Sequence, residues 1–302
     1  MKKKILLTGA SGFTGLHLLK ALLKSKKYKL AVIKRPRSSF SIIKSNRKQV
    51  VFYDLKSNSN NLFEILKSEK PDIVIHLAGF FQAEHQSNEI EEMMKTNLLL
   101  GTKLLEAMAR NGVKRLITAG TFWEYYEDKK IYNPVNLYAA TKHAFSDILQ
   151  YYIEAEGIKA VTLQIYDTYG SADPRKKLFY YLKNALTTGK TLEMSPAEQF
   201  LDLVYIDDVV EAYLKAVEYL LKKKDNRHEI FQIGSGKAVK LKNVVRLFEK
   251  IAGRKLSIKF GGRPYRKREV MSAKADIRKA KKVLGWRPKV SLTSGIQRIL
   301  GL

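Results

Sequence analysis

The sequence predicts an α/β fold, a Rossmann-type doubly wound parallel sheet with a smaller C-terminal α/β region that binds substrate. Three observations predict it. Short apolar runs alternate with amphipathic stretches through the first half of the chain, the first apolar run leads into a glycine-rich turn, and the alternation changes after Gly170. Strands joined through helices form parallel sheets that are covered on both faces.

The candidate strands are nearly continuous apolar runs, which is typical of strands buried on both faces. In chain order they are KKILLTG, YKLAVIK, QVVFYDL, PDIVIHLAG, VKRLITAG, IKAVTLQIYD and, later, HEIFQIGSG. Helix-like segments lie near 13–25, 60–69, 88–110 and 136–156. We expect a dinucleotide-binding domain over 1–166, rejoined by about 201–234, and a substrate-binding region over 167–200 and 235–302.

Composition excludes several classes of protein. A chain of 302 residues with 45% hydrophobic residues and seven prolines is expected to be globular rather than disordered. No apolar run approaches the ~18 residues that span a bilayer, so we expect a cytoplasmic protein without membrane insertion. The absence of cysteine excludes thiolate chemistry and cysteine-ligated metals, and the five histidines show no paired spacing, so no metal site is expected.

The formal net charge of +27 has two interpretations. A basic surface attracts polyanions, so a nucleotide-sensing or RNA-binding protein that uses a Rossmann fold as a scaffold is one alternative. The lysines are scattered along the chain, however, which favours a role in solubility. We therefore expect no nucleic-acid partner.

The first strand ends in TGASGFTG, directly before a helix-like stretch. Gly9, Gly12 and Gly15 are spaced for a tight turn, for close approach of the backbone to a pyrophosphate, and for packing of the helix on the strand. The turn predicts a dinucleotide cofactor, with Phe13 and Thr14 at the start of the helix among its contacts.

The end of the second strand distinguishes NAD(H) from NADP(H). An acid there holds the ribose 2′-hydroxyl of NAD, whereas an arginine accommodates the 2′-phosphate of NADP. The segment VIKRPRSS offers Lys34, Arg35 and Arg37 and no acid, which favours NADP(H), with NAD(H) as the alternative. Asp54, at the end of the third strand, is placed to accept a hydrogen bond from the adenine edge.

YAATK places Tyr138 and Lys142 four residues apart, on one face of a helix. An ammonium group beside a phenol favours the phenolate and lowers a pKa that starts near ~10, so the tyrosine can act as acid and base at neutral pH. We predict that these two residues are catalytic.

Together these motifs resemble the extended short-chain dehydrogenase/reductase family, also called the NAD-dependent epimerase/dehydratase family, and within it the nucleotide-sugar enzymes. Nine stretches carry the resemblance across nearly the whole chain: TGASGFTG, the DL of Asp54 and Leu55, HLAG from His76, KTNLLLGTKLLEA with Asn97, YAATK, IYDTYG, DLVYIDDVVEAYLKA, FQIGSG and LGWRP. The resemblance implies an NAD(P)-dependent oxidoreductase in which the cofactor carries the hydride.

The resemblance also implies roles for single residues. Thr121 matches the hydroxyl residue that joins the Tyr and Lys, and would hydrogen-bond the reacting oxygen. Tyr138 would transfer the proton and Lys142 would also hold the nicotinamide ribose. Further cofactor contacts are implied at Leu55, Leu77, Ala78, Gly79 and Asn97, where Asn97 orders the active-site helix or a water.

Differences from the family pattern distinguish between the reactions that the family catalyses. Dehydratases usually follow the hydroxyl residue with an Asp-Glu pair, but here Phe122 and Trp123 occupy those places. The stretches GTFWEYY, NPVNLYAATK and IYDTYGSADPRKKL resemble abequose and paratose synthases, which reduce the 4-keto group of a CDP-linked dideoxy sugar for lipopolysaccharide O-antigen. We therefore expect an NADPH-dependent reductase, with an NAD-dependent 4-epimerase as the alternative. The rings of Phe122 and Trp123 are expected to cover the apolar face of a deoxygenated sugar, with filling of the core corner as the alternative.

Three residues after the catalytic segment are candidates for substrate binding. Arg175 and Arg266 could bind the nucleotide diphosphate, because arginine contacts phosphate oxygens in a bidentate manner. Asp167 stands where many relatives carry an asparagine, and an acid there repels phosphate unless it is paired. Relatives often dimerise through the helices that carry Asn97 and Tyr138, and the sequence permits such a homodimer.

Overall fold

The structure is a computed structural model that describes residues 1–36, 38, 40, 49–128, 131–222 and 228–302. It contains two compact units. The first comprises Met1–Glu124, Asn136–Gln164 and Val210–Phe231, and the second comprises Tyr125–Val135, Ile165–Val209 and Gln232–Leu302. The sequence-based boundaries differ from these at 125–135, 165–166, 201–209 and 232–234. The assignment of cofactor to one part and substrate to the other stays a prediction.

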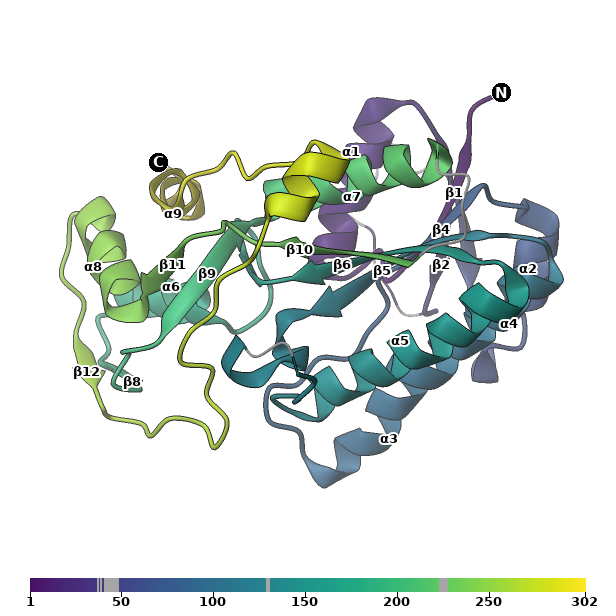
Figure 1. The fold of residues 1–302 in the computed structure, drawn as a ribbon. Helices are drawn as coiled ribbons and strands as arrows, with labels where there is room; N and C mark the ends of the chain where they lie inside the picture. Colours follow the sequence, from purple (N-terminus) through teal and green to yellow (C-terminus); the bar gives the residue numbers. More distant parts are fainter. Residues whose placement is uncertain (37, 39, 41–48, 129–130, 223–227) are drawn as a thin grey trace. The chain divides into compact units, whose positions relative to one another are not determined.

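The first unit is built on a seven-stranded sheet with the order β10-β6-β5-β4-β1-β2-β3 (Figure 1). Its strands are β1 (Lys4–Thr8), β2 (Lys29–Lys34), β3 (Val50–Asp54), β4 (Ile73–His76), β5 (Arg115–Thr121), β6 (Lys159–Ile165) and β10 (His228–Ile233), of which the last reaches into the second unit. The pairs β1·β2, β1·β4, β2·β3 and β4·β5 are parallel. The predicted doubly wound α/β fold is confirmed.

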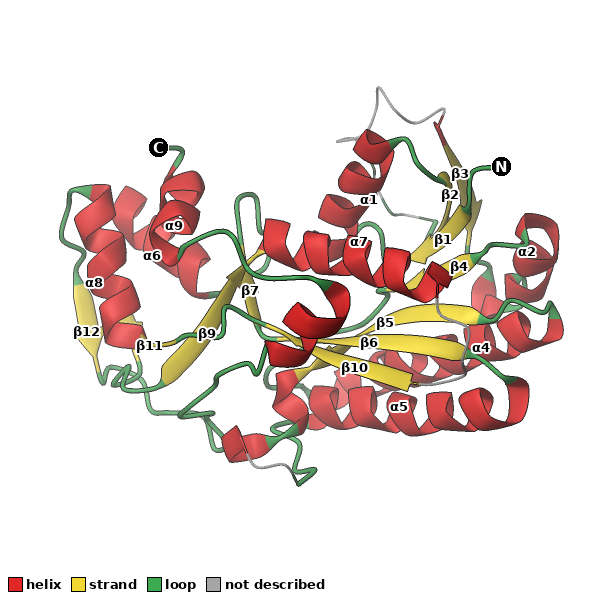
Figure 2. Cartoon of the chain, turned by 45° about the horizontal axis from the view of Figure 1, so that its top comes forward, coloured by secondary structure: helices red, strands yellow, loops and turns green. Residues whose placement is uncertain are grey.

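Helices cover both faces of this sheet, with α1 and α7 on one face and α4 and α5 on the other (Figures 1 and 2). The helices are α1 (Phe13–Ser25), α2 (Leu62–Glu69), α3 (Ile90–Met94), α4 (Leu100–Arg110), α5 (Leu137–Glu156) and α7 (Ile206–Lys222). Buried residues such as Leu6, Val74 and Leu116 from the strands pack against Leu105 and Leu149 from α4 and α5. Burial of this apolar layer explains the apolar runs at the centres of the strands.

The segment expected to be helical over 88–110 contains an interruption. A π-helical turn, Lys95–Leu99, separates α3 from α4 and carries Asn97. Such turns often mark functional positions, because they re-aim a side chain out of the regular helical spacing. Short 3-10 turns occur at Ser57–Ser59, Ser87–Glu89, Phe122–Glu124 and Tyr126–Asp128, and a second π turn at Ala280–Leu284.

The second unit has two small sheets, β11-β9-β7 and β12-β8. Its elements are β7 (Asp167–Tyr169), α6 (Leu178–Thr188), β8 (Leu192–Met194), β9 (Phe200–Tyr205), β11 (Ala238–Lys240), α8 (Leu241–Ala252), β12 (Ile258–Phe260) and α9 (Leu292–Leu300). The buried carboxylate of Asp202 accepts hydrogen bonds from the backbone N–H groups of Ser235, Gly236 and Ala275. One side chain thereby joins three separate segments of this unit.

In the described ranges, no helix has the length and apolar character needed to cross a membrane. Over the same ranges, no three His, Cys, Asp or Glu side chains gather as a group that could hold a metal ion.

Candidate active site

The glycine turn has the backbone that the predicted cofactor site requires. Gly9 has φ +71°, and a Cβ there would lie 2.3 Å from the Ala78 backbone nitrogen. A Cβ on Gly15 would lie 2.2 Å from the Gly9 carbonyl oxygen, so α1 packs directly on the turn. Gly12 precedes α1 in an extended conformation without a side-chain cap. The first amide groups of α1 therefore remain for a ligand, and the turn fits the pyrophosphate of a dinucleotide.

The last residues of β2 and β3 form an ion pair that the sequence did not predict. Lys34, at the end of β2, makes an ion pair with Asp54, at the end of β3. The pairing follows from the parallel register, in which Lys34 lies opposite Asp54. It offsets the positive charge of Lys34, whereas the adjacent Arg35 is exposed. Arg37 lies outside the described residues.

Thr121 ends β5 and is held on three sides. Its backbone N–H donates to Glu124 Oε1 at 3.0 Å, its carbonyl accepts from Gln164 Nε2 at 3.3 Å, and its hydroxyl accepts from the Trp123 N–H at 3.3 Å. A hydroxyl that accepts one bond can still donate its own proton. Thr121 is therefore both part of the turn and able to hydrogen-bond a reacting oxygen.

Tyr138 and Lys142 both lie on α5, which begins at Leu137. Asn136 caps the helix by accepting from the Ala139 N–H at 2.9 Å, and this fixes the first turn that carries Tyr138. Lys142 is buried, and burial lowers its pKa to about 8, while the charge of Glu124 acts in the opposite direction. The helix thus presents a phenol and an ammonium group one turn apart, as the sequence predicted.

Asn97 connects the loop after β4 to this helix. Its Oδ1 accepts from the Phe80 N–H at 2.7 Å, and its Nδ2 donates to the Phe80 carbonyl at 3.0 Å and to Thr141 Oγ1 at 2.9 Å. The Thr141 hydroxyl in turn donates to the Tyr138 carbonyl at 2.8 Å. These bonds use both hydrogens and one acceptor position of the amide, so the contacts favour the expected ordering of the active-site helix.

Aromatic rings surround the phenol. Phe81 packs edge-on against Tyr138 with ring centres 5.0 Å apart, and its centre lies 5.6 Å from that of Trp123. Phe81 is 40% exposed, whereas Phe122 is only 8% exposed. Phe81 and Trp123 therefore form an accessible apolar wall beside Tyr138, and Phe122 supports Trp123 from within, with ring centres 6.0 Å apart.

The second unit has its own cluster of charges around Asp167. Burial raises the pKa of this carboxyl group, and Lys177, Arg266 and Arg175 act in the opposite direction. Burial, with the charge of Arg175 beside it, lowers the pKa of Lys177. Asp202 also acts on Asp167 and raises its pKa, Asp173 pairs with Arg175, and Glu269 lies 4.0 Å from Arg266, so the acids and cations of this cluster balance one another.

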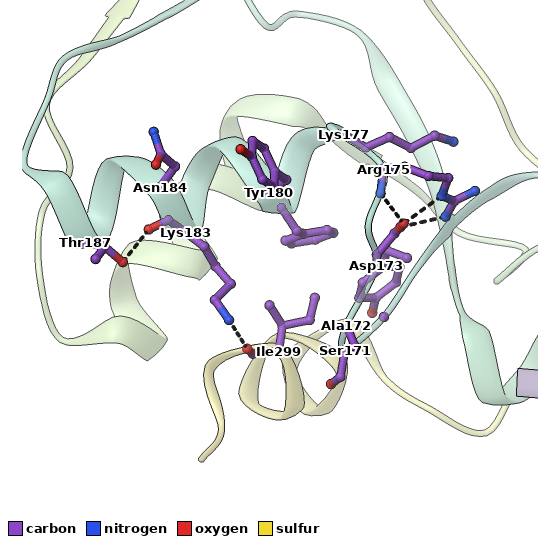
Figure 3. Close-up of a pocket in the computed structure, with 13 residues that line it drawn as sticks. Ser171, Ala172, Asp173, Arg175, Lys177, Tyr180, Lys183, Asn184, Thr187 and Ile299 are labelled. Atoms are coloured by element: carbon purple, nitrogen blue, oxygen red, sulfur yellow. Dashed lines mark hydrogen bonds and ion pairs between the residues drawn. The ribbon is translucent and has the colours of Figure 1, made fainter. Parts of the chain in front are cut away.

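Arg175 and Lys177 also line a pocket of about 330 Å³ in the second unit, next to α6 and α9 (Figure 3). Arg175 is held by both oxygens of Asp173, with Nε 2.7 Å from Oδ1 and Nη2 2.6 Å from Oδ2. A phosphate at Arg175 would compete with that carboxylate. Lys177, which the sequence did not single out, lines the same pocket and is a further candidate for contact with a phosphate.

A family model supplies the classification of the chain. The model described as the NAD dependent epimerase/dehydratase family matches residues 5–234. The chain belongs to this family. The match confirms the predicted class of enzyme, an NAD(P)-dependent oxidoreductase of the extended short-chain dehydrogenase/reductase type.

Several known proteins of this kind match along their whole length. A CDP-abequose synthase of Salmonella muenchen is 30% identical and covers 100% of this chain and 98% of its own. A UDP-glucuronate 4-epimerase of Thermodesulfobacterium geofontis is 27% identical, covering 97% and 94%. The structure of a UDP-glucuronic acid 4-epimerase from Bacillus cereus with UDP-glucuronic acid and NAD is 26% identical, with a TM-score of 0.87 and coverage of 99% and 98%.

Proposed function

We propose that the protein is an NADPH-dependent reductase of the 4-keto group of a nucleotide-linked deoxy sugar, with a CDP-linked 4-keto-3,6-dideoxyhexose as the expected substrate. One observation carries the proposal. The places where dehydratases of this family have acid and base hold Phe122 and Trp123, and Trp123 joins Phe81 in an apolar wall beside Tyr138. The full-length similarity to a CDP-abequose synthase supports the same reaction.

The chain's own residues supply binding, orientation and a proton. The nicotinamide cofactor, when bound, supplies the hydride to the carbonyl carbon. Thr121 donates a hydrogen bond to the carbonyl oxygen, and Tyr138 gives that oxygen its proton, so the carbonyl becomes a hydroxyl. Lys142 keeps the phenol acidic through its charge and holds the cofactor ribose. The wall of Phe81 and Trp123 excludes water from the deoxygenated face of the sugar.

We further propose that the charges around Asp167 bind the nucleotide diphosphate, with Lys177 and Arg266 as its main contacts. Burial and the charge of Arg175 lower the pKa of Lys177, because both disfavour its ammonium form. A bound anionic phosphate favours the ammonium form and so opposes both effects. Arg175, already paired with Asp173, has the smaller share. Arg35 is proposed to contact the 2′-phosphate of NADPH.

An NAD-dependent nucleotide-sugar 4-epimerase is the second candidate, and the ion pair of Lys34 with Asp54 favours it. That pair removes one cation from the expected 2′-phosphate contacts. An epimerase oxidises and then re-reduces its substrate, so it consumes no cofactor. A non-catalytic nucleotide-sensing or RNA-binding role would leave Tyr138 and Lys142 without a use.

Cofactor consumption distinguishes these candidates. The purified protein is mixed with NADPH and either a CDP-4-keto-dideoxy sugar or UDP-glucose, and NADPH absorbance is followed. A reductase consumes one NADPH for each sugar reduced and leaves UDP-glucose unchanged. Tightly held NAD with interconversion of UDP-sugars would favour the epimerase instead, and binding of RNA without turnover would favour the third alternative.

A further inference from the structure

Glu124 is a buried carboxylate that the motif-based mechanism does not use. It is 6% exposed and closes the 3-10 turn Phe122–Glu124. Its Oε1 accepts from the Thr121 N–H at 3.0 Å, and a Cβ on Gly120 would lie 3.3 Å from the same oxygen. The carboxylate therefore packs against the backbone that aims Thr121.

The other oxygen of Glu124 faces α5. Oε2 lies 3.2 Å from His143 Nδ1, and His143 follows Lys142 directly in the chain. His143 Nε2 in turn lies 3.9 Å from Asp147, whose side chain is 75% exposed. Glu124 is thus fixed between the Thr121 turn and the helix that carries Tyr138 and Lys142, and Asp147 is a solvent-facing carboxylate of the same cluster.

Among the described residues, Glu124 from the turn favours the ammonium form of Lys142, and His76 from β4 is its other titratable neighbour. The centre of the Phe145 ring also lies 6.0 Å from Lys142 Nζ. Burial, together with the Lys142 charge, lowers the pKa of His76 to about 3, so His76 is neutral and supplies no countercharge. Tyr138, one helical turn away, is the group that this ammonium has to influence.

We propose that Glu124 is a positioning residue of the Thr121, Tyr138 and Lys142 site: its buried carboxylate fixes the Thr121 turn and keeps the Lys142 ammonium charged, while His143 holds that carboxylate in place. The importance of this arrangement for turnover rests on the proposed reductase function. The electrostatic part does not, because it can be measured without any substrate.

The direct test is the titration of Lys142 by NMR in protein with 13C-labelled lysine, with Lys142→Met used to assign the signal. In the unchanged protein we expect titration near the pKa of about 8. Glu124→Gln keeps the size and the acceptor for the Thr121 N–H but removes the charge, and should lower the midpoint by about one pH unit. Glu124→Asp keeps the charge, so its Lys142 midpoint should lie close to that of the unchanged protein.

Asp147→Asn is the matched control, because it removes an exposed carboxylate from the same cluster. Its Lys142 titration should equal that of the unchanged protein. An unchanged midpoint in Glu124→Gln, or an equal shift in Asp147→Asn, would overturn the electrostatic role. Thermal unfolding of each variant verifies that the titration reports a folded protein.

The effect of Glu124 on the Thr121 turn is tested separately by the kcat of Glu124→Ala, which lacks both the charge and the acceptor for the Thr121 N–H. If Glu124 also positions Thr121, kcat in Glu124→Ala should fall about tenfold further than in Glu124→Gln, with KM little changed. Equal kcat in the two variants would remove the positioning role and leave only the charge. If the unchanged protein has no reductase activity, the proposed function is refuted, but the Lys142 titration still tests the electrostatic role of Glu124.

Discussion

The Thr121 corner of the first unit and the cationic cluster of the second unit differ in how they are held. Thr121 and the start of α5 are fixed by hydrogen bonds between neighbours in the chain and by packing on a buried sheet. The cluster around Asp167 consists of long charged side chains that balance one another. Hydrogen bonds in the first unit depend on the position of single atoms, whereas the charges in the second unit act over longer distances. The chemistry should therefore be sensitive to single atoms in the first unit, and binding should change in smaller steps in the second.

Tyr138→Phe tests the first region with the largest expected effect. Removing the phenolic oxygen removes the proton donor, so kcat should fall about a hundredfold to ten-thousandfold. The ring still packs against Phe81, and NADPH affinity by fluorescence titration should stay nearly the same. Turnover above about a tenth of the original would refute the catalytic assignment.

Gly9→Ala tests whether the cofactor turn depends on backbone geometry. A methyl group would meet the Ala78 backbone at 2.3 Å, with φ at +71°, so unfolding should become easier by about 3 kcal/mol or more. Gly112→Ala is the matched control, since its φ is +67° with nothing within 4 Å, and it should cost only about 1 kcal/mol. Equal losses in chemical denaturation would show that the close approach at Gly9 is unimportant.

His76 predicts acid sensitivity of the first unit. Its folded pKa of about 3 lies below the ordinary value of 6.5, so the unfolded chain takes up a proton first as the pH falls. Stability is therefore complete above pH ~6.5 and declines below it, by about 2 kcal/mol at pH 5. Urea denaturation at several pH values should show this slope, and His76→Gln should flatten it. The exposed His85→Gln is the control and should keep the slope of stability against pH. An unchanged slope in His76→Gln would mean that another group causes the acid sensitivity.

Lys177→Met tests the second region, where the smallest effect is expected. If Lys177 binds the diphosphate, KM should rise about tenfold, or about 1.4 kcal/mol, with kcat nearly unchanged. Lys183→Met is the control from the same pocket, since its ammonium already donates to the Ile299 carbonyl at 3.1 Å. A lower kcat with unchanged KM would mean that Lys177 acts on the reaction rather than on binding.

Local sequence patterns predicted the strands and helices, but they did not predict contacts between segments that are distant in the chain. The five strands up to β5 and the helices α1, α2 and α5 follow from apolar runs and helical spacing, and Gly9 follows from the turn. The pairing of Lys34 with Asp54 depends on strand register, which two separate runs do not reveal. Lys177 stood in a basic triplet whose members looked alike, and its place in the charge cluster of Asp167 depends on the fold.

The aromatic wall and Glu124 were missed for a related reason. Phe81 lies two residues after the HLAG motif, and its contact with Tyr138 spans 57 positions of the chain. The sequence did not assign a role to Glu124, because the partner on its other oxygen, His143, lies on a different element. Sequence spacing locates reacting groups on one element, but their supports come from elsewhere in the fold.

The central claim is that this site delivers a hydride to a sugar carbonyl with net consumption of NADPH. The most direct measurement uses NADPH that carries deuterium at the transferred position, with a CDP-4-keto-3,6-dideoxyhexose as substrate and mass spectrometry and NMR of the product. We predict one deuterium at C4 of each product sugar and one oxidised cofactor for each product. A product without deuterium, or turnover with no net loss of NADPH, would contradict the account.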